Sequence, residues 1–234
     1  MAGEVRGTGL SGNNKTRNVA CRIVDVLLFA DFVALMVFPV NYGIVHEWTG
    51  LAAFVLVIVH LAINVRRIAG LARSHDLAAI VNLAIEFALL LGIIAIAASS
   101  LVLSEYAFAW LPAIPGASWA RSIHLCVSYW IFTLAFVHFG LHLQGFLGRL
   151  SRRSAAKWAL RILFLVCLIY GIWSFAELRI WSYMTLQMQF AFVDPDIAVG
   201  FLQYGSMAIA LTGCGHCIGC VIRCIRKNAV AKEG

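Results

Sequence analysis

Five histidines stand in or at the edge of two long apolar stretches, and their spacing repeats. His46 and His60 are 14 residues apart, and so are His124 and His138. On an α-helix, 14 residues return to within about 40° of the starting direction while rising about 21 Å. Each stretch, if helical, therefore presents two imidazoles on one face at two heights. Ionisable groups inside a bilayer are costly, which marks such positions as functional candidates.

Two imidazoles that face each other across neighbouring helices can hold one metal ion between them. One further apolar stretch separates the two that carry histidine, so the two helices run in the same direction. His46 can then face His124 near one side of a membrane, and His60 can face His138 deeper in. The iron of a b-type haem takes two axial nitrogen ligands in this way, whereas zinc needs further ligands at each level. We therefore predict two haem b groups with these four histidines as iron ligands.

His142 offers an alternative to His138 as the inner ligand. It follows one helical turn later on nearly the same face, and counted back from the next basic residues it matches the depth of His60 better. The equal spacing of the two histidine pairs favours His138, because it needs no relative tilt of the helices. His142 is then a substitute ligand or a hydrogen-bonding neighbour. Arg121, within a turn of His124, suits haem propionates and equally suits a helix-end surface.

The composition explains which elements must carry these histidines. Of the 234 residues, 62% are hydrophobic and 12% are charged, and the mean hydropathy is +0.89. A soluble domain has roughly 25% charged residues, so a soluble protein is excluded. About 20 apolar residues are needed to cross a bilayer as a helix. Six stretches come close to that length: 23–40, 46–65, 77–103, 122–147, 159–178 and 197–221. We predict an all-α integral membrane bundle of six transmembrane helices.

The distribution of basic residues predicts how the bundle is oriented. Lysines and arginines gather in the segments that alternate crossings place on one side, and only Arg121 and Arg179 are left on the other. By the positive-inside rule both termini are cytoplasmic. The net charge of +7 follows from topology, so nucleic-acid binding is not expected. Residues 1–20 read as a flexible tail, 21–212 as the helical bundle and 213–234 as a Cys-rich basic cytoplasmic tail. The first stretch is too long for a signal-peptide core and should remain as an anchor.

Four cysteines near the carboxy terminus follow the spacing of bacterial ferredoxin clusters. Cys214, Cys217, Cys220 and Cys224 form a C-x-x-C-x-x-C-x-x-x-C run. The match is partial, because Ile225 replaces the usual proline and no second run follows. On an unbroken helix the four positions fall within an arc of about 120°, so one cluster could be held only if the helix unwinds. The two interpretations are an iron-sulfur site and reduced thiols at the cytoplasmic face.

Polar residues in the third stretch allow a rival function. Asn82 and Glu86 suit a quinone site or proton path, and equally an interhelical hydrogen bond. In one rival interpretation, His138 and His142 bind a divalent ion and Glu86 assists its passage through a transporter. In another, the chain is a cofactor-free membrane anchor of a redox complex.

Several separated motifs resemble one family. They are His46-Glu47-Trp48-Thr49-Gly50, His60, Asn64, Ser104, Arg121, His124, Tyr129-Trp130 and His138-Phe139-Gly140-Leu141-His142. Between residues 23 and 204 the chain resembles the bacterial flavinylation-associated membrane cytochromes. More distantly it is similar to respiratory cytochrome b, in which paired histidines on two parallel helices hold two haems.

The resemblance implies an electron-transfer subunit of a membrane oxidoreductase in the bacterial cytoplasmic membrane. Its partners would be the quinone pool or a cytoplasmic donor, and an extracytoplasmic flavoprotein that carries covalent FMN. Both His138 and His142 match the pattern of the family, so the choice between them stays open.

Overall fold

The computed structural model describes residues 8–38, 42–74, 76–143, 154–191 and 196–233. These residues are mostly helical and contain no strand. The helices are α1 (Thr8–Val37), α2 (Gly43–Ala72), α3 (Leu77–Leu103), α4 (Ala117–His142), α6 (Ser154–Glu177), α7 (Ile180–Met184) and α8 (Ile197–Glu233). The expected all-α fold is confirmed, and α3 has the bounds that the apolar pattern predicted.

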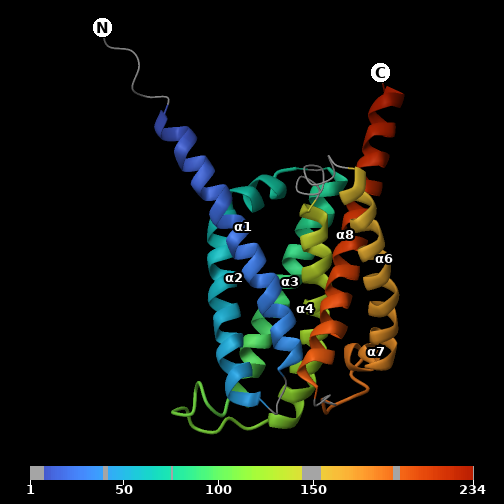
Figure 1. Ribbon diagram of the computed structural model, residues 1–234. Helices are drawn as coiled ribbons and strands as arrows, with labels where there is room; N and C mark the ends of the chain where they lie inside the picture. The colour runs from blue at the N-terminus through green and yellow to red at the C-terminus, as the bar shows by residue number, and fades with distance from the viewer. Residues whose placement is uncertain (1–7, 39–41, 75, 144–153, 192–195, 234) are drawn as a thin grey trace.

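Five of these helices are long and apolar enough to cross a membrane: α2, α3, α4, α6 and α8. The chain therefore fits a multi-pass membrane protein. Helix α1 is not among the five, because its apolar stretch is interrupted by Arg22, Asp25 and Asp31. The sixth crossing and the cytoplasmic location of the termini stay predictions. In Figure 1 the beginning of α1 and the end of α8 lie at the same end of the bundle, and the loop between α3 and α4 lies at the opposite end.

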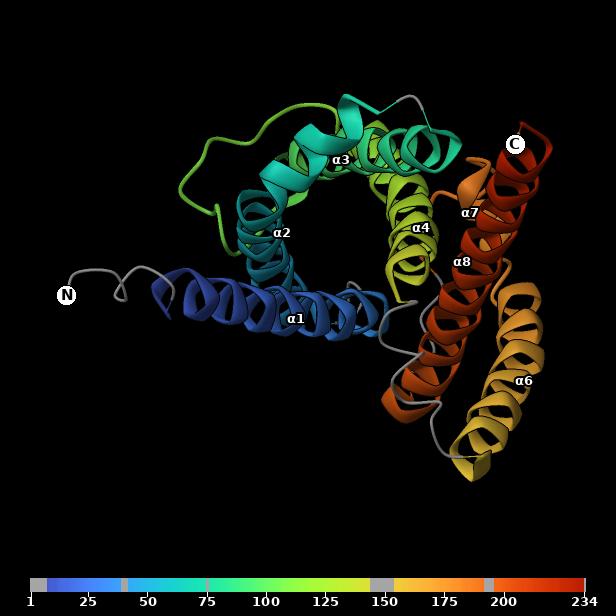
Figure 2. The same cartoon turned by 90° about the horizontal axis from the view of Figure 1, so that it is seen from above.

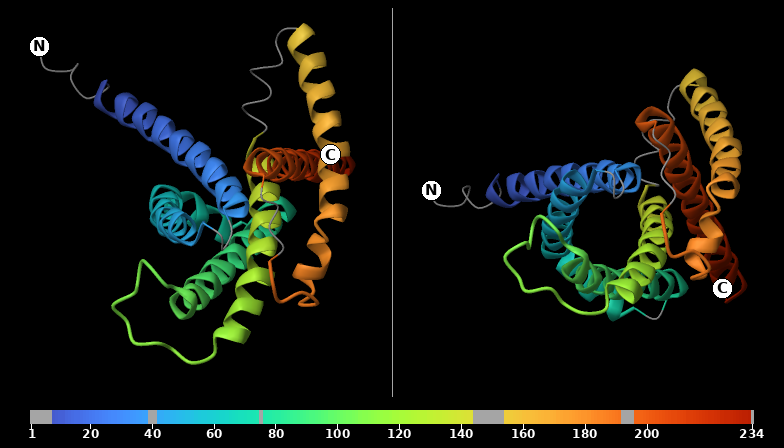
Figure 3. Two further views of the ribbon diagram at one scale, coloured as in Figure 1. Left: turned by 60° about the horizontal axis from the view of Figure 1, so that its bottom comes forward. Right: turned by 90° about the horizontal axis from the view of Figure 1, so that it is seen from below.

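The helices form two groups that share α4. Seen along the bundle, α1, α2, α3 and α4 follow one another around one side, while α6 and α8 lie beyond α4 (Figures 2 and 3). Helix α4 packs against α3 on one side and α8 on the other, and α6 packs on α8. Helices α2 and α4 run in the same direction, as the histidine pairing requires (Figure 1).

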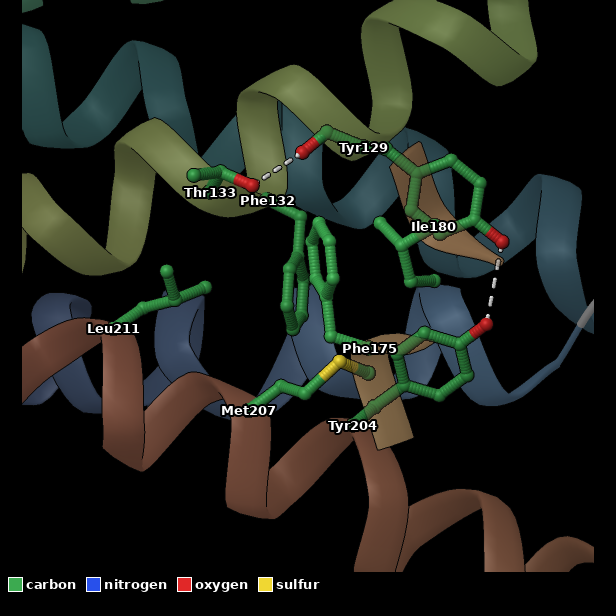
Figure 4. A pocket seen from close by; sticks show the side chains of 8 residues that line it. All are labelled: Tyr129, Phe132, Thr133, Phe175, Ile180, Tyr204, Met207 and Leu211. Carbon is green, nitrogen blue, oxygen red and sulfur yellow. Dashed lines mark hydrogen bonds between the residues drawn. The ribbon is translucent and has the colours of Figure 1, made fainter. Parts of the chain in front are cut away.

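The contact between α4 and α8 is close because both helices place glycine there. A side chain at Gly140 would meet the backbone of α8, and one at Gly215 would meet the backbone carbonyl of Val137. Small residues at a helix contact allow such an approach in membranes. Aromatic side chains fill the adjoining space: the small pocket in Figure 4 is lined by Tyr129, Phe132 and Tyr204, among others, and the hydroxyls of the two tyrosines are 3.3 Å apart. This packed half holds α4, and with it three histidines, in place.

Two segments that we expected to be tails contain helix. Helix α1 begins at Thr8, within the segment 1–20 that we expected to be flexible, and residues 1–7 lie outside the described part. The segment 213–234, expected as a separate tail, continues α8 without a break as far as Glu233. Neither segment contains a proline, so nothing prevents a helix that begins in an apolar stretch from continuing into polar sequence.

Candidate functional site

His46 and His124 lie next to each other at the end of the bundle that holds the loop between α3 and α4. Their ring centroids are 6.1 Å apart and their planes are inclined by 63°. His46 belongs to the first turn of α2, and His124 is two turns into α4. Both side chains are half-buried. The structure thus brings these two predicted residues together.

The Nδ1 atom of each of these two rings has a hydrogen-bond partner. His46 Nδ1 lies 2.6 Å from the carbonyl oxygen of Phe38, to which only an Nδ1–H can donate. His124 Nδ1 lies 3.3 Å from Ser99 Oγ and 3.4 Å from Ser100 Oγ. Ser99 donates its own proton to the carbonyl of Ile96, so it accepts from the imidazole. In both neutral rings the lone pair is therefore on Nε2, the arrangement found in metal-ligating histidines.

The separation of these two rings matches a shared metal ion. A metal–nitrogen bond of about 2 Å on each side places the centroids of two opposite imidazoles about 6 Å apart. The centroid separation of His46 and His124, 6.1 Å, is close to this value. The residues present at this level fit the axial ligation of a haem, whose chemistry needs two neutral imidazoles with fixed tautomers.

His60 lies at the second level, beside α1. Its Nδ1 is 3.0 Å from Asp25 Oδ1. The contact does not have the alignment of a hydrogen bond, so it is a close electrostatic approach between a half-buried carboxylate and imidazole. His138 lies near His60, but the histidine whose ring contacts that of His138 is His142. The carboxylate thus lies beside the ring of His60 on the α1 side.

The nearest neighbours of His138 are Glu86 and His142, not His60. The donor atoms of Glu86, His138 and His142 all lie within 4.8 Å of one another. The rings of the two histidines are 4.6 Å apart and nearly perpendicular. Glu86 Oε2 and His138 Nδ1 are buried and have no hydrogen-bond partner among the described residues. This group combines two imidazoles and one carboxylate, a donor set that divalent transition metals accept.

Arg67 distinguishes the two candidate inner ligands. Its Nη2 donates to His142 Nδ1 at 2.5 Å, so His142 can offer a lone pair to a metal ion only if Arg67 moves away. His138 has no such competing donor among the residues described. This difference favours His138 as the inner ligand, with His142 as its neighbour.

The remaining predicted site residues, Arg121 and the four cysteines, do not belong to the histidine groups described above. Arg121 is exposed, and its guanidinium carbon is 5.8 Å from the centroid of the Phe190 ring. The four cysteines, Cys214, Cys217, Cys220 and Cys224, are exposed along the intact helix α8. Within the described part of the chain they do not converge as a ligand group. The iron-sulfur site stays a prediction that requires α8 to unwind.

Four residues of this site were not predicted from the sequence: Asp25, Arg67, Ser99 and Ser100. The serine pair had a signal, because two hydroxyls in the middle of an apolar stretch need a partner in lipid. Asp25 had a similar signal as a carboxylate in the first apolar stretch. Arg67 had none, since the orientation rule already explains a basic residue at that position.

Comparison of the chain with known protein families, with curated proteins and with solved structures finds no match. The assignment of function therefore depends on the geometry of these residues and on the motifs quoted above.

Proposed function

We propose that this protein carries electrons across a membrane as a b-type cytochrome. The observation that supports the proposal best is the outer pair, His46 and His124, with its ring separation of 6.1 Å and both Nδ1 atoms engaged. When bound, haem iron supplies one-electron redox chemistry. The protein supplies the ligands, fixes their tautomers and keeps water away with apolar walls.

The inner haem would take His60 and His138. Asp25 would orient His60. Arg67 would occupy Nδ1 of His142, so that His142 would not bind the iron. The two levels would be about 21 Å apart along α2. Together they would span most of the thickness of a hydrocarbon layer, which is about 30 Å. Electrons would pass in two steps between donors and acceptors on opposite faces.

The partners in the proposal come from the family resemblance. They are the quinone pool or a cytoplasmic donor on one side and an extracytoplasmic flavoprotein with covalent FMN on the other. The apolar helices support a lipid bilayer as the environment, and the bacterial cytoplasmic membrane is part of the proposal.

Absorption spectra of the purified protein, oxidised and reduced, test this function. We expect haem bands that His46→Ala and His60→Ala each diminish by about half, since each replacement removes one ligand of one haem. His75→Gln is the matched control, because this histidine stands in the sequence between the apolar stretches 46–65 and 77–103 and belongs to neither. Retention of both haems in His60→Ala would refute the inner pair, and a colourless wild-type protein would refute the function.

The second candidate function is the handling of a divalent metal ion. The specific observation in its favour is the group of Glu86, His138 and His142, which includes two buried donor atoms without partners. A colourless preparation that contains zinc or manganese would favour this function if the Glu86→Gln variant no longer holds the metal. A protein with neither haem nor metal would favour a cofactor-free anchor subunit.

A further inference from the structure

The carboxylate of Glu47 organises the loop that follows α3. Its Oε2 accepts from the hydroxyl of Ser104 at 2.7 Å and from the backbone N–H of Ala107 at 2.8 Å. Its Oε1 accepts from the N–H of Glu105 at 2.8 Å, and the N–H of Tyr106 lies 3.1 Å from Oε2. Three consecutive backbone N–H groups and one hydroxyl thus converge on a single carboxylate. Such a concave set of N–H groups is a nest that binds an anion, and here the anion is a side chain of the same protein.

Two further contacts close the loop over the beginning of α2. Ser104 Oγ accepts from the N–H of Phe108 at 3.1 Å, which extends the ordered turn by one residue. The ring of Tyr106 lies against Gly43, where an added Cβ would be 3.0 Å from Cε2 of the ring. The loop therefore rests on the first turn of α2, which has no side-chain cap at Tyr42.

The hydrogen bonds of Glu47 connect the beginning of α2 with the end of α3, and the position of the outer histidine pair depends on both helices. Glu47 is adjacent to His46 in the first turn of α2. The loop follows directly from the end of α3, which carries the serines that hold His124. Direct packing between α2 and α3 is sparse compared with that between α3 and α4, so a strong polar contact at their ends has much influence on their relative position.

We propose that Glu47 is a positioning residue that sets the distance and angle between His46 and His124. It does so by fixing the beginning of α2 to the end of α3, without contact with the metal. The inference rests on the proposed function, because the two histidines matter as a pair only if they share a metal ion.

The test compares Glu47→Gln with Glu47→Asp and with the control Glu105→Gln in the full-length protein. Glutamine removes the charge and turns an amide toward the nest, whereas aspartate keeps the charge on a shorter side chain. Glu105 belongs to the same loop, but its side chain is exposed. Hydrogen exchange of the backbone amides of 105–107 is measured in the haem-free protein. EPR of the ferric protein reports the outer haem, because the g values of a low-spin haem depend on the angle between its axial imidazoles.

In Glu47→Gln we expect the three amides to exchange at least about tenfold faster. We also expect the EPR signal of the outer haem to shift or broaden while that of the inner haem is unchanged. Glu47→Asp should restore part of both properties, and Glu105→Gln should alter neither. Faster exchange with an unchanged EPR signal would mean that Glu47 only stabilises the loop, which overturns the proposal. Unchanged exchange would also overturn it. A wild-type protein without haem would instead refute the proposed function, and the exchange experiment would still report the loop.

Discussion

The contact between Asp25 and His60 leads to a prediction that separates the two occupants of the inner level. Asp25→Asn keeps the size of the side chain and removes its charge. The carboxylate lies 3.0 Å from the imidazole, and the side chains are 34% and 27% exposed. The pair is thus neither a surface ion pair, worth about 1 kcal/mol or less, nor a fully buried one.

A small rotation of either side chain would align this contact as a hydrogen bond. A carboxylate hydrogen-bonded to a metal-bound imidazole orients it and raises its basicity, and the loss of such a partner typically lowers metal affinity by about 10–100-fold. The corresponding cost is about 1.4–2.7 kcal/mol. We therefore expect Asp25→Asn to weaken binding of the inner haem by this factor in a haem titration of the haem-free protein. We also expect the midpoint potential of the inner haem to rise, because a carboxylate beside the imidazole favours the ferric state. The outer haem should bind as in the wild-type protein.

Asp31→Asn is the matched control, since this aspartate lies on the same helix and its Oδ2 has no hydrogen-bond partner among the described residues. If Asp25→Asn and Asp31→Asn give the same inner-haem affinity and potential, then His60 is not an iron ligand oriented by Asp25. A metal ion held by Glu86, His138 and His142 should lose less affinity on Asp25→Asn than on Glu86→Gln, because Asp25 does not belong to that group. Loss of Glu86 would release such an ion, so the two variants together decide between the occupants.

Three further predictions concern the bundle and the outer pair. Gly140→Ala places a methyl group against the backbone of α8 and should lower the free energy of unfolding by about 1–3 kcal/mol. The measurement is the midpoint of thermal unfolding in detergent, which should fall. Gly70→Ala is the control, because an added Cβ there has nothing within 4 Å, and it should not lower the midpoint. Arg226→Ala breaks the 3.0 Å ion pair with Asp76, in which the arginine side chain is 66% exposed. The free energy of unfolding should therefore change by less than about 1 kcal/mol. A larger loss would mean that the pair is shielded from water in the membrane protein. Replacing Ser99 and Ser100 together by alanine should weaken the outer haem by about 10–100-fold, whereas either replacement alone leaves one hydroxyl near His124 and should have a smaller effect in the same haem titration.

Helical periodicity was sufficient to predict the outer histidine pair. His46 and His124 face each other because equal spacing on two parallel helices fixes both face and height. The same periodicity could not predict what surrounds His138. Spacing within α4 gives the direction of a side chain, but it does not say which of the neighbouring helices supplies the residue opposite. Glu86 on α3 and Arg67 on α2 reach the inner histidines because of how the helices are arranged, and that arrangement depends on packing across the whole bundle.

The role of Glu47 was also beyond the reach of the sequence pattern. It lies next to a predicted ligand in a quoted motif, but its partners come 57–60 residues later in the chain. Most of them are backbone N–H groups, which carry no residue type for a motif to record. The hydropathy pattern did not predict the ends of most helices, for a related reason. A hydropathy pattern marks where apolar sequence stops, whereas the helix itself continues until a proline, a cap or a competing contact ends it.

Helix α1 brings the membrane prediction and the site into one argument. Its charged residues make it the least membrane-like of the long helices, yet one of them contributes to the candidate site. Asp25 contacts a histidine of α2, and a carboxylate with such a partner costs less in a bilayer than an isolated one. The beginning of α1 and the end of α8 lie at the same end of the bundle (Figure 1), which is the arrangement expected if α1 is the sixth crossing. The sixth crossing stays a prediction, and in it Asp25 would stand in the membrane beside His60.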